Sequence, residues 1–198
     1  MSRKRVAIMI SGRGSNMATL IDAAKDPAYP AEIVLVLSNR PDAAGLARAQ
    51  GDGIATAVVD HKQFGKDREA FDRAVQATLE AHRIEIVCLA GFMRLLTPWF
   101  VAQWAGRMIN IHPSLLPAFK GLHTHERALA EGATQHGATV HFVTSELDDG
   151  PIIAQESVAV RSDDTADTLA ARVLEVEHRL YPLALRRVAE GQTAPACS

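Results

Sequence analysis

Short apolar runs alternate with amphipathic segments along the first half of the chain. The runs at 6–11, 33–37, 54–59 and 84–90 are apolar almost throughout. A strand that is buried on both faces has this character, whereas a half-exposed strand alternates apolar and polar positions. We therefore expect four strands of a parallel sheet at these positions.

Segments with helical periodicity separate these strands. After the first strand, Met17, Leu20 and Ile21 recur at the spacing of one helix face. Helices are expected at 17–24, 43–50 and 67–82. Strands and helices that alternate in this way favour right-handed βαβ crossovers. The pattern therefore predicts a doubly wound, Rossmann-like α/β fold.

The pattern changes after a fifth strand, which is expected at 108–112. A loop bounded by prolines leads to a short helix at 126–131. Two segments rich in β-branched residues follow at 138–144 and 151–160, and the stretch ELDDG between them is typical of a turn. We expect these two strands to be antiparallel.

An amphipathic helix and a short polar tail end the chain. The helix begins near Ala166, and a kink is expected at Pro182 because proline cannot donate a backbone hydrogen bond. No internal repeat or linker interrupts the sequence, so we predict one domain over 1–190, with a parallel N-terminal half and a mixed C-terminal half. The tail at 191–198 is expected to be disordered.

The charge balance argues against a nucleic-acid partner. The 198 residues include 21 Lys and Arg against 23 Asp and Glu, which gives a formal net charge of −2 without the basic excess that binds phosphate backbones. No apolar run approaches the roughly 18 residues of a transmembrane helix. The two cysteines are too few for a disulfide framework. We expect a cytoplasmic protein with small-molecule substrates, no membrane contact, and a monomeric or weakly homodimeric state.

A glycine-rich loop, SGRGSN at 11–16, follows the first predicted strand. It precedes a helix N-terminus, where free N–H groups and the helix dipole favour an anion. Met17 stands where a dinucleotide fingerprint has its last glycine, and the lysine of a P-loop is missing. The loop is either a phosphate site or a tight turn that uses the freedom of glycine. Arg40, after the second strand, keeps NADP as an alternative ligand.

Two polar side chains end the fifth predicted strand. Asn110 and His112 are two residues apart, so both point to the same face. They lie at the edge where open α/β sheets place their ligands. A carboxamide that donates to an oxyanion, beside an imidazole that moves a proton, suits acyl transfer. The alternative is that both side chains bond to nearby loop backbone.

An acidic turn offers a partner for this imidazole. Asp148 and Asp149 both lie in the turn, and a carboxylate near His112 would orient the ring and stabilise its charged form. Spacing does not decide between the two acids, and an ordinary β-turn uses the same residue types. His125 begins an HExxH frame, but Leu129 fills its last position, so we predict no metal site.

Four segments together resemble the phosphoribosylglycinamide formyltransferase family of folate-dependent enzymes. They are SGRGSN at 11–16, VCLAGFMRLL at 87–96, INIHPSLLPAFKGLHTH at 109–125 and HFVTSELDDGPII at 141–153. The resemblance covers nearly the whole chain. It implies a single formyltransferase domain over 1–190. It also implies transfer of a formyl group from 10-formyltetrahydrofolate to the amine of glycinamide ribonucleotide in purine biosynthesis, without a metal.

The same resemblance implies a catalytic trio. It favours Asp148 over Asp149, because the family pattern reads Asp, any residue, Gly, Pro. Asn110 and protonated His112 are expected to stabilise the negative oxygen of a tetrahedral intermediate. Asp148 is expected to keep His112 charged.

The resemblance also implies which residues bind the two substrates. The ribonucleotide phosphate is expected at Gly14, Ser15 and Asn16, and Glu177 is expected to hold the glycinamide end. The residues expected to bind the folate donor are Arg68, Met93, Arg94, Leu95, Leu96, Asn110, Thr144, Ser145, Glu146, Leu147 and Asp148. Apolar side chains and backbone groups would hold the pterin, and arginines would meet the anionic glutamate tail.

Two positions depart from the family pattern. Asp149 stands where a small residue is common, and Lys120 precedes Gly121 where related chains carry proline. Asp149 adds a second negative charge beside Asp148. We therefore expect the two departures to affect the details of this loop.

Other activities use similar residues. The enzyme alternatives are a formyltransferase that acts on another amine, such as an amino sugar nucleotide, and a formyltetrahydrofolate hydrolase. The alternative outside catalysis is a module that binds folate or nucleotide without turnover. Dependence of the reaction on the amine separates these alternatives.

Overall fold

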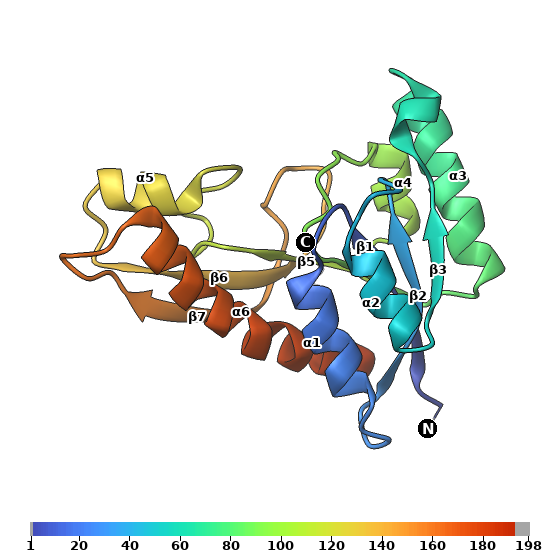
Figure 1. Ribbon diagram of the computed structural model, residues 1–198, viewed down its shortest axis with the longest axis horizontal. Coiled ribbons are helices and arrows are strands. Elements are labelled where there is room, and N and C mark those ends of the chain that lie inside the picture. The colour runs from blue at the N-terminus through green and yellow to red at the C-terminus, as the bar shows by residue number, and fades with distance from the viewer. Residues whose placement is uncertain (1, 193–198) are drawn as a thin grey trace.

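The computed structural model describes residues 2–192 and contains a seven-stranded mixed sheet (Figure 1). The strands are β1 (Lys4–Ile10), β2 (Ala31–Ser38), β3 (Ala55–Val58), β4 (Ile86–Leu89), β5 (Met108–His112), β6 (Gln135–Phe142) and β7 (Ile152–Ala159). Their order is β3-β2-β1-β4-β5-β6-β7. Pairing is parallel from β3 to β5 and antiparallel from β5 to β7. The predicted α/β fold, with a parallel and an antiparallel half, is confirmed.

Helices cover both faces of the sheet. They are α1 (Ser15–Ala24), α2 (Gly45–Gly51), α3 (Arg68–Ala81), α4 (Pro98–Gln103), α5 (Thr124–Ala130) and α6 (Ala166–Ala189), together with the 3-10 turn η1 (His61–Phe64). In Figure 1, α1 and α6 lie together along one face, and α3 and α4 lie on the other. Among residues 2–192, no helix has the length and apolar character needed to cross a membrane.

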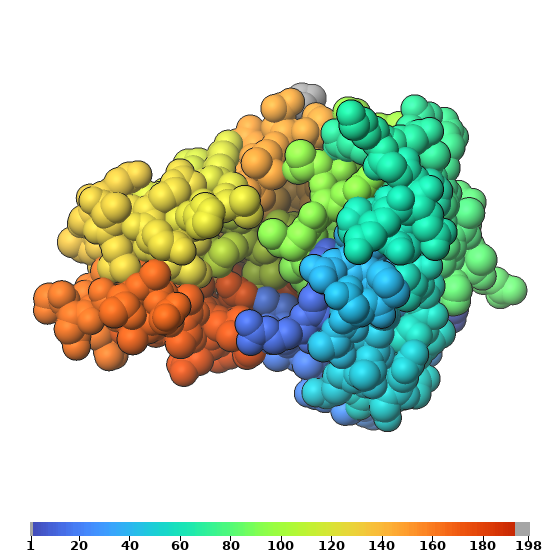
Figure 2. All heavy atoms as spheres, turned by 45° about the horizontal axis from the view of Figure 1, so that its top comes forward, coloured from blue at the N-terminus to red at the C-terminus, as the bar shows by residue number. Residues whose placement is uncertain are grey.

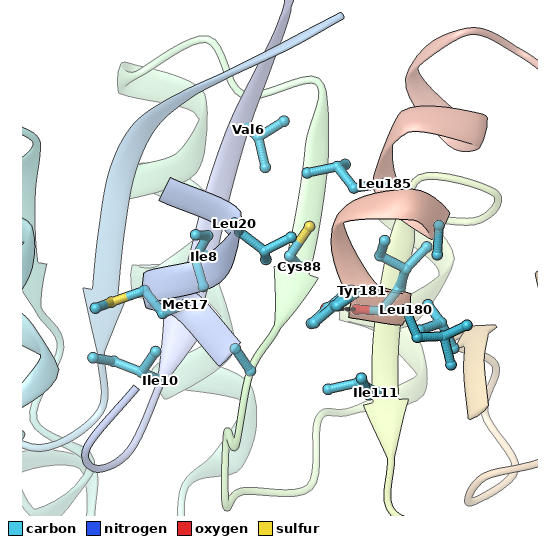
Figure 3. Close-up of a cluster of buried hydrophobic side chains, with 14 of the residues drawn as sticks. Val6, Ile8, Ile10, Met17, Leu20, Cys88, Ile111, Leu180, Tyr181 and Leu185 are labelled. Atoms are coloured by element: carbon cyan, nitrogen blue, oxygen red, sulfur yellow. Dashed lines mark hydrogen bonds between the residues drawn. The ribbon is translucent and has the colours of Figure 1, made fainter. Parts of the chain in front are cut away.

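Two buried clusters explain why the parallel strands are apolar throughout. On β1, Val6, Ile8 and Ile10 pack toward α1 and α6, and Figure 3 shows this cluster around Tyr181. The intervening side chains, Ala7 and Met9, pack toward α3 and α4. Because each strand supplies apolar side chains to both faces, its sequence does not alternate.

Some element bounds differ from the predictions. Helix α4 and the turn η1 were not predicted, because each is too short to show a helical period. Helix α4 is set instead by its first residues: Thr97 caps it by accepting a hydrogen bond from the backbone N–H of Phe100, and Pro98 occupies its first turn. Strand β6 covers 135–142 rather than 138–144, because its first residues pair with the end of β7.

The last helix continues through the proline where a kink was expected. Helix α6 spans 24 residues with Pro182 inside it, and the Tyr29 hydroxyl donates a hydrogen bond to the Pro182 carbonyl. The predicted disordered tail covers 191–198. Residues 193–198 of it lie outside the described residues.

Candidate active site

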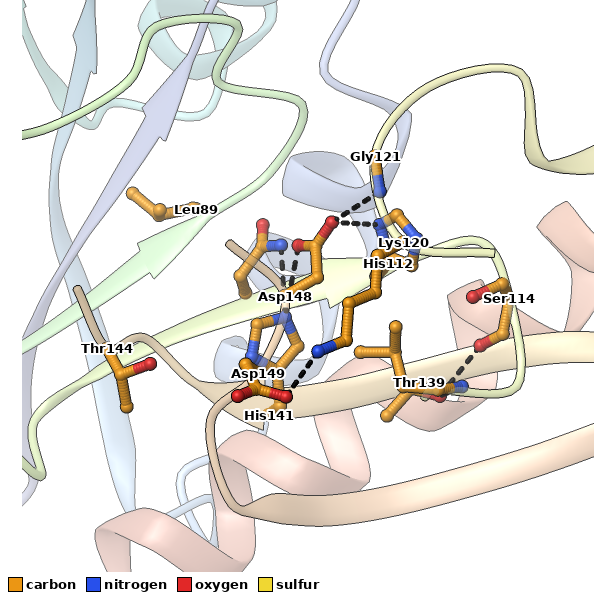
Figure 4. A network of polar contacts seen from close by, with 12 residues as sticks. Leu89, His112, Ser114, Lys120, Gly121, Thr139, His141, Thr144, Asp148 and Asp149 are labelled. Carbon is orange, nitrogen blue, oxygen red and sulfur yellow. Dashed lines mark hydrogen bonds and ion pairs between the residues drawn. The ribbon is translucent and has the colours of Figure 1, made fainter. Parts of the chain in front are cut away.

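The predicted trio meets at the carboxyl end of β5. Asn110 and His112 come from the strand. Figure 4 shows His112 beside Asp148, which comes from the loop between β6 and β7. His112 Nδ1 lies 3.4 Å from Asp148 Oδ2, and the two side chains are only 7% and 8% exposed. Water is therefore largely excluded from a pair of groups that can carry opposite charges, which strengthens their interaction.

A left-handed backbone turns Asp148 toward His112. Asp148 has a φ of 49°, a conformation that aspartate tolerates better than most residues. Its carboxylate accepts a hydrogen bond from the Gly121 backbone N–H at 2.9 Å. The neighbouring Asp149 pairs instead with Lys120. The structure therefore places Asp148, and not Asp149, beside the imidazole.

The second nitrogen of His112 is held by backbone. His112 Nε2 lies 2.9 Å from the carbonyl oxygen of Phe119. Because a carbonyl can only accept, Nε2 carries a proton. A second proton on Nδ1 would face the Asp148 carboxylate.

His141 is a site residue that the sequence analysis missed. It lies directly opposite Asn110 in the β5–β6 pairing. Its Nδ1 donates to the Phe142 carbonyl at 2.8 Å, which leaves Nε2 as an acceptor 3.4 Å from Asn110 Nδ2. Burial lowers the pKa of His141 and keeps this ring neutral. The available signal was the alternation of polar Thr139 and His141 with apolar residues over 138–142 of the strand.

The first loop presents free backbone donors at the start of α1. Gly14 precedes the helix with a φ of 71°, and no side chain caps it. A Cβ on Gly14 would lie 3.1 Å from the Met17 methyl group, so glycine suits both the backbone angle and the space. The first-turn N–H groups of α1 thus remain open to an anion.

Glu177 reaches the same loop from the far end of the chain. Asn16 Nδ2 donates to Glu177 Oε2 at 2.6 Å, although the residues are 161 positions apart. Burial raises the pKa of Glu177, and the Asn16 hydrogen bond opposes that rise. Asn16 Oδ1 is buried without a hydrogen-bond partner. A ligand with an N–H or O–H group would satisfy this acceptor.

The residues expected to bind folate surround a hollow in the surface. Figure 2 shows this hollow between the green segment near residue 95, the orange loop near 148 and the yellow segment near 120. Met93, Leu95 and Leu147 are 67%, 62% and 56% exposed, which is unusual for large apolar side chains. Arg68 donates to the Leu95 and Leu96 carbonyls at 3.0 and 3.4 Å and so ties α3 to the β4–α4 loop.

The sequence profile of formyl transferases matches residues 4–185. The chain belongs to the formyl transferase family. This formyl transferase is 46% identical over 187 residues to the phosphoribosylglycinamide formyltransferase of Escherichia coli strain K12, which covers 94% of this chain and 88% of that protein. The family prediction is confirmed.

A solved structure and a longer relative extend the comparison. The phosphoribosylglycinamide formyltransferase of Brucella melitensis superimposes with a TM-score of 0.91 at 55% identity, covering 98% of this chain and 100% of that one. The trifunctional purine biosynthetic protein adenosine-3 of Bos taurus is 51% identical over 189 residues, or 96% of this formyl transferase. The chain spans only 19% of that protein's length.

A pocket of about 410 Å³ opens beside the first loop of this formyl transferase, and Met93 and Arg94 of the expected folate site also line it. It is lined in part by Ser11, Asn39, Arg40 and Arg94, and none of the trio reaches it. Arg40, which had kept NADP open as a ligand, forms an ion pair with Asp42 at 2.8 Å.

Within the described range of 2–192, no three His, Cys, Asp or Glu side chains are grouped to hold a metal ion. Cys88 is fully buried in β4, where burial raises the pKa of its thiol. Its environment is that of a small core residue.

Proposed function

We propose that this formyl transferase moves the formyl group of 10-formyltetrahydrofolate to the amine of glycinamide ribonucleotide. The observation that supports this most is the buried contact between His112 and Asp148, 3.4 Å apart at the end of β5, with Asn110 on the same strand face. The E. coli and Brucella melitensis relatives, both phosphoribosylglycinamide formyltransferases, support the same acceptor.

The reaction begins when the neutral amine attacks the formyl carbon. A carbon–nitrogen bond forms, and the formyl oxygen becomes negative in the tetrahedral intermediate. Asn110 Nδ2 has two hydrogens: one faces His141 Nε2, and the other is free to donate to this oxygen. The positive charge of protonated His112 stabilises the same oxygen, and the Asp148 carboxylate stabilises that positive charge.

Collapse of the intermediate breaks the bond between the formyl carbon and N10 of the folate. The attacking amine loses one proton, and the departing folate nitrogen gains one, so the proton count balances. We assign the movement of this proton to His112, because an imidazole can both accept and donate a proton. The products are the formylated ribonucleotide and tetrahydrofolate.

The ribonucleotide fits the first loop and α6. Its phosphate would accept hydrogen bonds from the free N–H groups at Gly14, Ser15 and Asn16, which have no side-chain cap. Its glycinamide end would lie by Glu177 and supply a donor to the unpartnered Asn16 Oδ1. Binding in this way would bring the amine toward the trio.

The folate donor fits the hollow on the other side of the trio. The exposed side chains of Met93, Leu95 and Leu147 would cover its flat rings and leave water on binding. Arg68 and Arg94 would face its carboxylates. The remaining residues proposed for this pocket are Leu96, Asn110, Thr144, Ser145, Glu146 and Asp148.

A steady-state assay tests the proposal. Purified protein is mixed with 10-formyltetrahydrofolate, and tetrahydrofolate production is followed with and without glycinamide ribonucleotide. The proposal predicts production only when the ribonucleotide is present. Equal production without it would establish a hydrolase instead. No production in either case would require another amine, such as an amino sugar nucleotide, or a binding role without turnover.

A further inference from the structure

The two residues that depart from the family pattern contact each other. Lys120 lies in the loop between β5 and α5, and Asp149 lies in the loop between β6 and β7. The Lys120 ammonium and the Asp149 carboxylate form an ion pair and hydrogen bond, drawn in Figure 4. Their side chains are 37% and 53% exposed, so this pair lies at the surface, whereas the neighbouring His112 and Asp148 are buried.

Lys120 is the middle of three consecutive residues that hold the catalytic pair. On one side, the Phe119 carbonyl accepts the hydrogen bond from His112 Nε2. On the other, the Gly121 N–H donates to Asp148 Oδ2. The segment 119–121 therefore contacts His112, Asp149 and Asp148 in turn. A movement of this segment would disturb both members of the catalytic pair together.

Side chains outside the two loops also support this segment: the Arg127 guanidinium lies over the Phe119 ring at 5.5 Å, and that ring packs edge-on against His136. The exposed Arg127 side chain of α5 donates a hydrogen bond to the Lys120 carbonyl oxygen at 2.7 Å. Phe119 has a φ of 55°, a backbone conformation that favours glycine. The ion pair adds to the Gly121–Asp148 hydrogen bond as a second contact between this segment and the Asp148 loop, so it helps to restrain a strained stretch of backbone.

Lys120 also offsets an additional negative charge. Without it, the Asp149 carboxylate would stand uncompensated one residue from Asp148. Such a charge would draw solvent and nearby cations, including the Arg127 guanidinium, toward the site entrance. The paired arrangement leaves the Asp148 carboxylate as the acid that faces the imidazoles of His112 and His141.

We propose that Lys120 and Asp149 form a latch that positions His112 and Asp148 for the formyl transfer proposed above. Both are positioning residues, because they act through the segment 119–121 rather than on the substrates. The inference rests on the proposed function for its kinetic readout. It also has a structural readout that does not need turnover.

The kinetic test compares Lys120→Met, Asp149→Asn and the double variant with the unaltered protein. Exposed ion pairs contribute modestly, so each single substitution is expected to lower kcat by about two- to fivefold. KM for either substrate should change less than about twofold, because neither side chain touches the substrates. The double variant should lose no more than Lys120→Met alone, and Lys120→Arg should restore most of kcat.

Lys4→Met is the matched control. Lys4 forms an ion pair with Glu85 at 2.8 Å, with exposures of 46% and 41%, far from the trio. It should leave kcat unchanged. The latch is wrong if the three site variants keep full kcat, if their losses multiply in the double variant, or if Lys4→Met loses as much.

Hydrogen–deuterium exchange separates failure of the latch from failure of the proposed function. Lys120→Met should speed exchange in the segment 113–123 at least twofold, because the Gly121 N–H would be released more often from Asp148. Unchanged exchange would overturn the latch even in an inactive protein. Faster exchange in a protein that forms no formylated ribonucleotide would support the positioning role of the latch and contradict the proposed substrates.

Discussion

The φ angle of Asp148 decides which of the two neighbouring acids lies beside the His112 imidazole. Asp148 adopts a φ of 49° and turns its carboxylate to His112, and Asp149 points to Lys120 instead. The residue types and their spacing left both acids open, and only the family resemblance favoured Asp148. Asn110 and His112 were predictable from the two-residue period of a strand. The contact of His112 with the Phe119 carbonyl was not predictable, because any residue type can present a backbone oxygen.

The carboxamide of Asn110 is expected to carry much of the oxyanion stabilisation. Asn110→Ala removes the Nδ2 donor and should lower kcat about 100- to 1000-fold, as the loss of one oxyanion donor does elsewhere. The single-turnover and steady-state rates of tetrahydrofolate release measure this, with circular dichroism to verify the fold. Turnover at the wild-type rate would exclude Asn110 from this role.

The charge of Asp148 is expected to matter more than its shape. Asp148→Asn keeps the size of the side chain but removes the charge that stabilises protonated His112, so kcat should fall about a hundredfold or more. Asp149→Asn is the matched control, and its loss should not exceed about fivefold. If the two variants lose equal activity, the assignment of the acid to Asp148 is incorrect.

Longer elements were predictable, and elements set by caps or distant partners were not. Strand β5 matches its predicted range of 108–112, because its apolar run ends in two polar side chains at the sheet edge. Helix α4 depends on the Thr97 cap and on burial of Phe100, neither of which produces a period in six residues. The same holds for the site. His141 could not be predicted from the sequence, because its position opposite Asn110 depends on the β5–β6 register.

The packing of α5 on β6 should weaken in mild acid. His136 Nε2 lies 3.2 Å from His125 Nδ1, and burial lowers both pKa values, that of His136 to about 4. Because these folded-state values lie below the ordinary value near 6.5, the unfolded chain binds protons first as pH falls. The contribution to stability is complete above pH 6.5 and is lost progressively between about 6.5 and 4.

Urea unfolding at a series of pH values measures this loss. His136→Gln lacks the titrating ring, so its free energy of unfolding should depend less steeply on pH between about 6.5 and 4 than that of the unaltered protein. Equal slopes in the two proteins would show that the histidine pair does not link pH to stability.

The loop that carries Asp148 has no room for a side chain at Gly150. A Cβ there would lie 1.7 Å from the Phe142 carbonyl oxygen. Gly150→Ala should therefore lower the free energy of unfolding by more than about 2 kcal/mol, or displace the loop and lower kcat. Gly51→Ala, where a Cβ meets nothing within 4 Å, is the control and should be nearly neutral in urea unfolding. A Gly150→Ala protein with wild-type stability and activity would contradict the packing.

At the scale of the molecule, the site joins parts of the chain that are far apart in sequence. Helix α6 packs on α1 and brings Glu177 to Asn16, and its Tyr181 hydroxyl donates to the Leu89 carbonyl of β4 at 2.8 Å. Hydrophobic periodicity predicted that α6 exists, but not which loop it would meet. The binding role of Glu177 was therefore reached through the family resemblance and not through the spacing of residues.

Transfer of a labelled formyl group is the most direct test of the proposed reaction. The protein would be given 10-formyltetrahydrofolate labelled with carbon-13 in the formyl group, together with glycinamide ribonucleotide, and the products would be analysed by mass spectrometry. We predict that the label appears on the ribonucleotide in a one-to-one ratio with the tetrahydrofolate released. Label recovered as free formate, or retained on the folate, would contradict the proposed formyl transfer.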